Sequence, residues 1–162
     1  MGFSNENIDI GWRGKVRFIF VDKILEMIPG QSIRALKTIK PDEEYFRDHF
    51  PGFPVVPGVL LTEMMAQAAG KCLDAEKRPR GRSMLARIKS ASFHGWVEPG
   101  REATIFAKIV TNKDQYASAE CYVEVDGRKA CQAELFFTFV PLDKFSMGYV
   151  DEVLESYLSS AQ

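Results

Sequence analysis

The stretch VLLTEMMAQAAGKCLDAE, residues 59–76, predicts a helix that lies inside the protein. Apolar side chains cover most of its circumference, and a helix that is apolar nearly all round is a buried helix. The dipeptide of Pro57 and Gly58 stands directly before it and marks where the helix begins. Its polar positions fall on a single narrow stripe, and they are Glu63, Gln67, Lys71 and Asp74.

Strand patterns fill most of the remaining chain. We expect β-strands at 21–28, 32–40, 84–93, 103–110, 116–125 and 129–139. The pairs Pro29-Gly30 and Asp126-Gly127 predict tight turns between neighbouring strands. Two strands, a buried helix and four more strands predict an α+β fold in which an antiparallel sheet curls around the helix. The open edge of such a sheet needs a partner or a cap, so a homodimer is expected.

Length and composition narrow the class of protein. The chain has 162 residues, of which 46% are hydrophobic and 27% charged, as expected for one soluble domain over residues 1–162. A net charge of −1 gives no support to nucleic-acid binding. No membrane span and no signal peptide are recognisable, so a cytoplasmic location is expected. Cys72, Cys121 and Cys131 lack metal-ligand spacing, and we expect free buried thiols and no metal site.

Two segments stand apart from this pattern. The run EKRPRGR, residues 76–82, is basic and contains Pro79 and Gly81, which indicates an exposed loop inside the domain. Residues 142–162 form a C-terminal tail that is predicted to be helical. Apolar residues recur in it at helical spacing, at Tyr149, Val153, Tyr157 and Leu158.

A candidate site lies where DHFPGFPVVPG, residues 48–58, leads into the helix. His49 suits a general base, because histidine titrates near neutrality. Glu63 follows in the helix, and the backbone N–H of Gly58 at the helix N-terminus is placed to hold a developing oxyanion. Such a set is what proton abstraction next to a carbonyl requires. The residues alone leave alternatives open: a structural role for His49, and a solvent-facing Glu63.

The longer stretch DHFPGFPVVPGVLLTEMMAQAAG resembles the 3-hydroxyacyl-[acyl-carrier-protein] dehydratases of the FabZ type, and less closely the FabA type. Their motif, HFPGxPxxPGVLxxExxAQ, is matched at every fixed position. The segments FIFVDKILEMIPGQSIRALKTI, FHGWVEPG and YVEVDGRKACQAELFFTFV extend the resemblance to about residues 17–140. The matched motif positions are His49, Phe50, Pro51, Gly52, Pro54, Pro57, Gly58, Val59, Leu60, Glu63, Ala66 and Gln67.

The resemblance implies a hot-dog fold, in which the sheet wraps around a long central helix. It implies that His49 removes the α-proton of a (3R)-hydroxyacyl thioester and that Glu63 acts on the departing β-hydroxyl, giving a trans-2-enoyl thioester. The N–H of Gly58 would hold the thioester carbonyl. Supporting roles fall to Phe50, Pro57 and Gln67. In this family the His and Glu of one site come from different subunits, which implies an obligatory homodimer, and many members are trimers of dimers.

The resemblance also implies acyl carrier protein as a partner, with the substrate on its phosphopantetheine arm and no separate cofactor. Phe53 and Trp96 are candidates for an acyl tunnel, although Trp96 could equally be ordinary core. The basic run could dock the acidic carrier protein, or it could be a solvated loop. Its candidate docking residues are Lys77, Arg78, Arg80 and Arg82, with Arg87 and Lys89 as possible neighbours.

The chain departs from the family pattern in places. His94-Gly95-Trp96 replaces a basic residue and proline, and we do not expect His94 to be a second catalytic histidine. GWRGKVRF stands where the family has a Pro-His-Arg-Tyr-Pro lead-in, which leaves the entrance and the chain-length preference open. Glu63 stands where the FabA type has Asp, so efficient isomerisation of the product is not expected.

Two other functions stay open on the sequence. One is a hydratase or thioesterase acting on coenzyme A thioesters, which would use the same histidine and oxyanion donor. The other is a non-catalytic scaffold or acyl-binding protein that has kept the fold. Retention of both His49 and Glu63 favours an enzyme over the second alternative.

Overall fold

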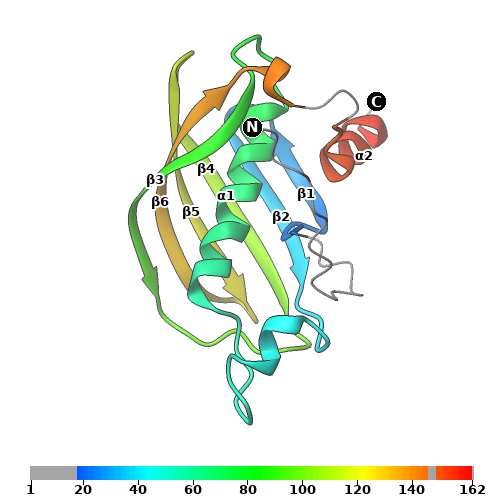
Figure 1. Ribbon diagram of the computed structural model, residues 1–162, viewed down its shortest axis with the longest axis vertical. Helices are drawn as coiled ribbons and strands as arrows, with labels where there is room; N and C mark the ends of the chain where they lie inside the picture. The colour runs from blue at the N-terminus through cyan, green and yellow to red at the C-terminus, as the bar shows by residue number, and fades with distance from the viewer. Residues whose placement is uncertain (1–17, 146–148, 162) are drawn as a thin grey trace, which may run out of the picture.

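The computed structural model describes residues 18–145 and 149–161, and it shows a six-stranded antiparallel sheet curved around one long helix (Figure 1). The order of the strands in space is β1-β2-β4-β5-β6-β3, so β3 forms an edge although it is third in the chain. The predicted hot-dog fold is confirmed. The strands are β1 (Lys23–Ile28), β2 (Ser32–Thr38), β3 (Arg82–Phe93), β4 (Glu102–Asn112), β5 (Tyr116–Val125) and β6 (Arg128–Val140).

The central helix α1 spans Gly58–Asp74, with Pro57 at its N-cap. It ends at Asp74, two residues before the predicted end at Glu76, and the left-handed backbone of Lys77, with φ 51°, cannot continue it. The carboxylate of Glu76 instead accepts hydrogen bonds from Arg80, at 2.8 Å, and from Asn112, at 2.9 Å. None of the helices in the described ranges is long and apolar enough to cross a bilayer.

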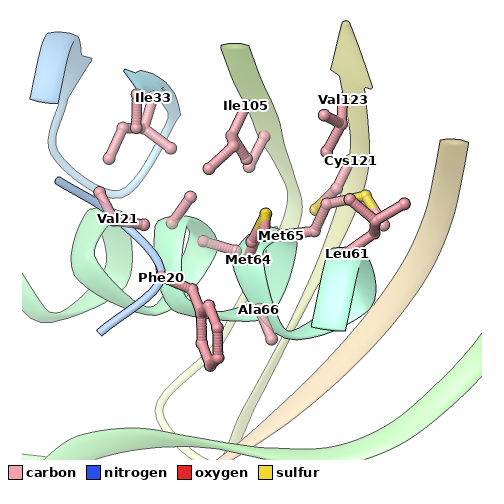
Figure 2. Close-up of a cluster of buried hydrophobic side chains, with 14 of the residues drawn as sticks. Phe20, Val21, Ile33, Leu61, Met64, Met65, Ala66, Ile105, Cys121 and Val123 are labelled. Atoms are coloured by element: carbon pink, nitrogen blue, oxygen red, sulfur yellow. The ribbon is translucent and has the colours of Figure 1, made fainter. Parts of the chain in front are cut away.

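The core lies between α1 and the concave face of the sheet. Figure 2 shows Met64 and Met65 of the helix directed toward apolar side chains of the strands, among them Ile33 and Ile105. Burial of this face holds the helix against the sheet, because removing each apolar side chain from water lowers the free energy of the folded state. The fully buried helix residues Ala68 and Ala69 let the strands approach closely.

The three cysteines are free and buried, as predicted. Burial raises the pKa of Cys72 to about 11 and that of Cys121 to about 12. Burial also raises the pKa of Cys131 to about 11. A thiolate nucleophile needs a lowered pKa, so none of these thiols is suited to catalysis near neutrality.

The turn between β5 and β6 has the backbone that its sequence predicts. Asp126 and Gly127 both have positive φ angles, of 52° and 73°. Val125 pairs with Arg128 across a two-residue loop, as in a type I′ hairpin. The register of β5 against β6 at this turn is therefore set by a local signal.

The C-terminal tail contains a 3-10 turn, η2 (Leu142–Lys144), and a helix, α2 (Glu152–Ser160), which lies beside β1 (Figure 1). The side chain of Asp151 accepts a hydrogen bond from Leu154 N and caps α2. Tyr149, which the periodicity placed in the helix, therefore lies before its first turn. Residues 146–148 and 162 of the predicted helical tail lie outside the described residues.

Candidate active site

His49 lies in the loop between a 3-10 turn, η1 (Glu44–Arg47), and α1. Its ring nitrogen Nδ1 is 2.9 Å from the backbone oxygen of Val55. A carbonyl oxygen can only accept, so Nδ1 carries the hydrogen and donates it. In the neutral ring this leaves Nε2 with a free lone pair, which is the form that a general base needs. The ring also stacks on that of Phe50, with centroids 4.1 Å apart.

Backbone hydrogen bonds hold this loop on both sides of the histidine. The His49 N–H donates to Tyr45 O at 3.0 Å, and the Val55 N–H donates to His49 O at 3.1 Å. Phe50 and Phe53 exchange two backbone hydrogen bonds, and the His49–Phe50 peptide bond is cis. The hydrogen bonds hold the loop backbone, and the bond from Nδ1 to Val55 O orients the ring on it.

The N-terminus of α1 presents unused backbone donors. Leu60 and Leu61 both donate to Pro57 O, while no described residue accepts from the N–H of Gly58 or Val59. These N–H groups lie at the positive end of the helix dipole, which favours an anion. A Cβ on Gly58 would lie 3.0 Å from the Phe93 ring, so the ring packs directly against this glycine.

Glu63 is half-buried one turn further along the helix, and a glutamine positions its carboxylate. Gln67 Nε2 donates to Glu63 Oε1 at 3.0 Å, and it also donates to Phe18 O at 3.2 Å. Gln67 Oε1 accepts from the Phe20 N–H at 2.8 Å, which determines how the amide is oriented. The contact between Gln67 and Glu63 agrees with the supporting role expected for Gln67.

The polar stripe of α1 opens onto a groove of about 670 Å³. All four stripe residues, from Glu63 to Asp74, line it, together with the start of β3 and part of the C-terminal tail. His49 is not among the described residues that line this groove. A single chain therefore does not bring the proposed base and the proposed acid into one cavity.

The predicted tunnel residues and the second histidine lie elsewhere. Phe53 and Trp96 contact each other edge to face, with ring centroids 5.9 Å apart, and both are exposed in the single chain. Neither lines the groove beside Glu63. His94 continues the backbone pairing of β3, since its N–H donates to Ala130 O at 2.7 Å.

The basic run after α1 is largely engaged with the chain itself. Arg78 pairs with Asp114, and Arg82 lies 3.4 Å from a carboxylate oxygen of Asp74. The exposed-loop interpretation is wrong for Arg80, whose side chain is only 4% exposed. Its guanidinium pairs with Glu76 and lies 3.8 Å from the centre of the Phe139 ring. Lys77 is the member of the run that extends furthest into solvent, and docking through the run stays a prediction.

Sequence reasoning missed several groups around the site. The backbone oxygen of Val55 is one, because a carbonyl has no residue-type signal. The tail residue Asp151 is another, and it lies 2.6 Å from the ammonium of Lys71, on the polar stripe of α1. Only the amphipathic pattern of the tail hinted that it packs against the domain.

Related sequences show the family to which this chain belongs. Residues 14–134 match the model of the FabA-like domain family, which is most of the chain. The chain belongs to this family. The FabZ of Ruminiclostridium cellulolyticum, a 3-hydroxyacyl-[acyl-carrier-protein] dehydratase, is 36% identical over 74% of this chain and 85% of its own length. The FabZ of Lactobacillus helveticus is 39% identical over 74% of this chain and 81% of its own length.

Solved structures share the fold at lower identity. The dehydratase heterocomplex ApeI:P of Xenorhabdus doucetiae aligns with a TM-score of 0.55 at 18% identity, covering 70% of this chain and 92% of that one. The smu.793 protein of Streptococcus mutans, solved with acetyl CoA, aligns with a TM-score of 0.59 at 9% identity, covering 80% and 97%. These likenesses support the architecture.

Proposed function

We propose that this protein dehydrates (3R)-3-hydroxyacyl thioesters, carried by acyl carrier protein, to trans-2-enoyl thioesters during acyl-chain synthesis. The observation that carries the proposal is the hydrogen bond between His49 and Val55, because it leaves Nε2 as the proton acceptor beside a helix N-terminus. The FabZ relatives support the substrate class. No metal or organic cofactor is required by the scheme.

The reaction needs one proton removed and one delivered. His49 Nε2 takes the α-proton while the N–H of Gly58 stabilises negative charge on the thioester oxygen, an effect worth about 3 kcal/mol per donor. The C–O bond at the β-carbon then breaks as the carboxyl of Glu63 gives its proton to the hydroxyl, and water leaves. The C=C bond forms between the two carbons. Proton transfer from the imidazolium to the carboxylate, through solvent, restores both groups.

A second copy of the chain would complete the site. The edge strand β3 is exposed along most of its length, and Ile88 and Phe93 are both 50% exposed. A long apolar edge of this kind is normally covered by a partner. Pairing of two β3 edges would place the His49 loop of one subunit beside the Glu63 groove of the other. Further apolar side chains around the loop and the helix start are exposed, namely Phe50, Phe53, Val59 and Trp96.

A complementation experiment tests the chemistry and the shared site together. Enoyl formation from (3R)-hydroxyacyl carrier protein is followed by absorbance for the wild type, His49→Ala, Glu63→Ala and a refolded mixture of the two variants. Each variant should lose about a thousandfold of activity. Random mixing makes half of the dimers mixed, each with one intact site, so the mixture should regain about a quarter of wild-type activity.

The outcomes separate the parts of the proposal. A mixture as inactive as its components would contradict the shared site, while active single variants would contradict the assigned base and acid. Turnover of coenzyme A thioesters but not of carrier-protein substrates would favour the hydratase or thioesterase alternative. Wild-type protein inactive on both classes would favour a non-catalytic acyl-binding role. Light scattering on the same samples distinguishes a dimer from a trimer of dimers.

The basic run gives a separate test of the carrier protein as partner. Lys77 is exposed, and its ammonium has a solvent-screened contact with Glu155, at 3.6 Å. Charges of this kind mainly raise the rate of encounter with an acidic partner. Lys77→Ser should raise the KM for carrier-protein substrates at low salt, whereas replacing Arg80 or Arg82 would also break ion pairs with Glu76 and Asp74. An unchanged KM in Lys77→Ser would contradict docking through this residue. The cytoplasmic location also stays a prediction.

A further inference from the structure

The groove beside Glu63 has a wall that lies outside the region shared with the family. The matched region ends at residue 134, whereas Tyr149, Val150 and Val153 of the C-terminal tail line this groove. Met84 and Leu85 at the start of β3 also line it. The tail is therefore part of the cavity that contains the proposed acid.

The groove runs along α1 away from the reacting atoms. At about 1.5 Å per residue, the stripe from Glu63 to Lys71 extends about 12 Å along the helix. If Glu63 protonates the β-hydroxyl, the β-carbon of the substrate lies next to the Glu63 carboxyl. The rest of the acyl chain must then extend away from that point. This groove contains Glu63 and leads from it toward the tail, so it offers the acyl chain a path.

Charged residues at the far end of the groove are paired, which leaves apolar side chains to meet a ligand. Lys71 lies 2.6 Å from Asp151, and Arg82 lies 3.4 Å from Asp74. Because each of these charges already has an opposite charge beside it, none requires a charged ligand. The apolar lining includes Met84, Leu85, Val150 and Val153.

The tail is held in place by contacts to the rest of the domain. Asp151 bonds to Lys71, and Tyr149 packs under Arg82, whose guanidinium carbon is 4.2 Å from the ring centre. Leu154 is buried, and Tyr157 Oη accepts a hydrogen bond from the Met27 N–H at 3.1 Å. A wall anchored by a buried ion pair and a buried leucine can limit what fits beside it.

From these contacts we propose that residues 149–153 determine acyl-chain length by closing the far end of the groove, an inference that rests on the proposed dehydratase function. Val150 and Val153 are the residues that meet the end of the chain. Val150 is 56% exposed, so changing it leaves the core intact. Shorter side chains here should admit longer acyl chains, and a larger one should exclude them.

The test compares hydroxyoctanoyl and hydroxyhexadecanoyl carrier protein as substrates. In a Val150→Ala/Val153→Ala variant the ratio of kcat/KM for the long chain over the short chain should rise about tenfold. In Val150→Trp the same ratio should fall about tenfold. Ser156→Ala is the matched control, because Ser156 is exposed on α2 and does not line the groove, and it should leave the ratio unchanged.

A binding measurement makes the inference independent of turnover. Unreactive S-octyl and S-hexadecyl pantetheine thioethers are titrated into each protein by calorimetry, and the ratio of their dissociation constants should shift in the same directions. An active wild type whose two ratios stay constant in both variants overturns the role of the tail and leaves the dehydratase standing. A wild type that neither turns over hydroxyacyl substrates nor binds the thioethers overturns both proposals.

Discussion

The two ends of α1 differ in how completely one chain covers them. At the N-terminal end, the Gly58 N–H has no acceptor within residues 18–145 and 149–161, Val59 is 76% exposed, and the neighbouring Phe93 lies on an open sheet edge. At the other end, Lys71 is buried against Asp151 of the tail. The proposed dimer would cover the N-terminal end with a second copy, whereas the far end is covered within the chain.

The largest effect is expected from a substitution that removes the proposed cover of the N-terminal end of α1, which we call the open end. Ile88→Asp places a carboxylate on the exposed edge strand β3. In the proposed dimer this carboxylate would be buried in both subunits, and the two copies would lie close together. Unpaired buried charges and like charges facing each other each cost several kcal/mol, so the dimer should weaken by about 4 kcal/mol, or about a thousandfold in Kd. Light scattering should show monomers, and dehydratase activity should fall with the dimer.

Val110→Asp is the matched control for that prediction. Val110 is 56% exposed on β4, against 50% for Ile88, but β4 lies inside the sheet rather than at the β3 edge. It should leave both association and activity close to the wild type. If Ile88→Asp stays dimeric and active, the two copies meet elsewhere and the open end has another cover.

The second prediction concerns the closed end of α1, which is the end where Lys71 lies against Asp151. Lys71→Met leaves Asp151 buried without its closest cation, since the next, Arg82, is 3.9 Å away. Removing one partner of a buried ion pair should lower the free energy of unfolding by about 3 kcal/mol. Urea unfolding measures this directly. Adding Asp151→Asn should recover most of the loss, because no uncompensated charge then remains.

An exposed ion pair on the same tail gives the control. Lys77 and Glu155 lie 3.6 Å apart with side chains 64% and 47% exposed. Lys77→Met should cost less than about 1 kcal/mol, as exposed pairs generally do. Equal losses in Lys71→Met and Lys77→Met would show that the far end is not sealed by its ion pair.

The same contrast explains what could be predicted from the sequence. The helix, its polar stripe and the Asp126-Gly127 hairpin follow from periodicity and turn chemistry within short windows, and all are present in the structure. His49, Gly58 and Glu63 stand in one continuous motif, so their order along the loop and helix could be inferred.

The sequence could not predict contacts between residues that lie far apart along the chain. Asp151 meets Lys71 across eighty residues, and Arg78 meets Asp114 across thirty-six, so neither pairing leaves a local pattern. The basic run therefore looked more exposed than it is. The hydrogen bond from His49 ends on a backbone oxygen, which any residue at position 55 would provide.

The third prediction returns to the open end with a smaller change. In Gly58→Ala the new Cβ would lie 3.0–3.2 Å from three atoms of the Phe93 ring, so the ring has to shift. Overpacking of this size costs about 2 kcal/mol, part of which should appear as lower kcat because the N–H moves with the helix start. Gly95→Ala is the control, since nothing lies within 4 Å of a Cβ there. Combining Gly58→Ala with Phe93→Leu should restore stability; if it does not, the ring is not the obstacle.

The smallest effect is expected in the pH dependence of the closed end. Burial raises the pKa of Asp74 above its ordinary value of 3.8, an effect that the Ser83 N–H and Arg82 oppose and that Asp151 reinforces. The folded state therefore holds this proton to higher pH than the unfolded state does. The contribution of Asp74 to the free energy of unfolding falls as pH rises from 3.8 through the raised pKa. Above the raised pKa this contribution is constant.

Asp74→Asn cannot ionise, so it removes this fall. Relative to the wild type, the variant should gain under about 1 kcal/mol of unfolding free energy between about pH 3 and about pH 7. Urea unfolding at both pH values measures the change, in which any constant loss from the Ser83 contact cancels. Glu102→Gln removes an exposed carboxylate and should show no such gain. A change of the opposite sign in Asp74→Asn would mean that, at Asp74, the attraction of Arg82 and the Ser83 hydrogen bonds outweigh the cost of burying the carboxylate.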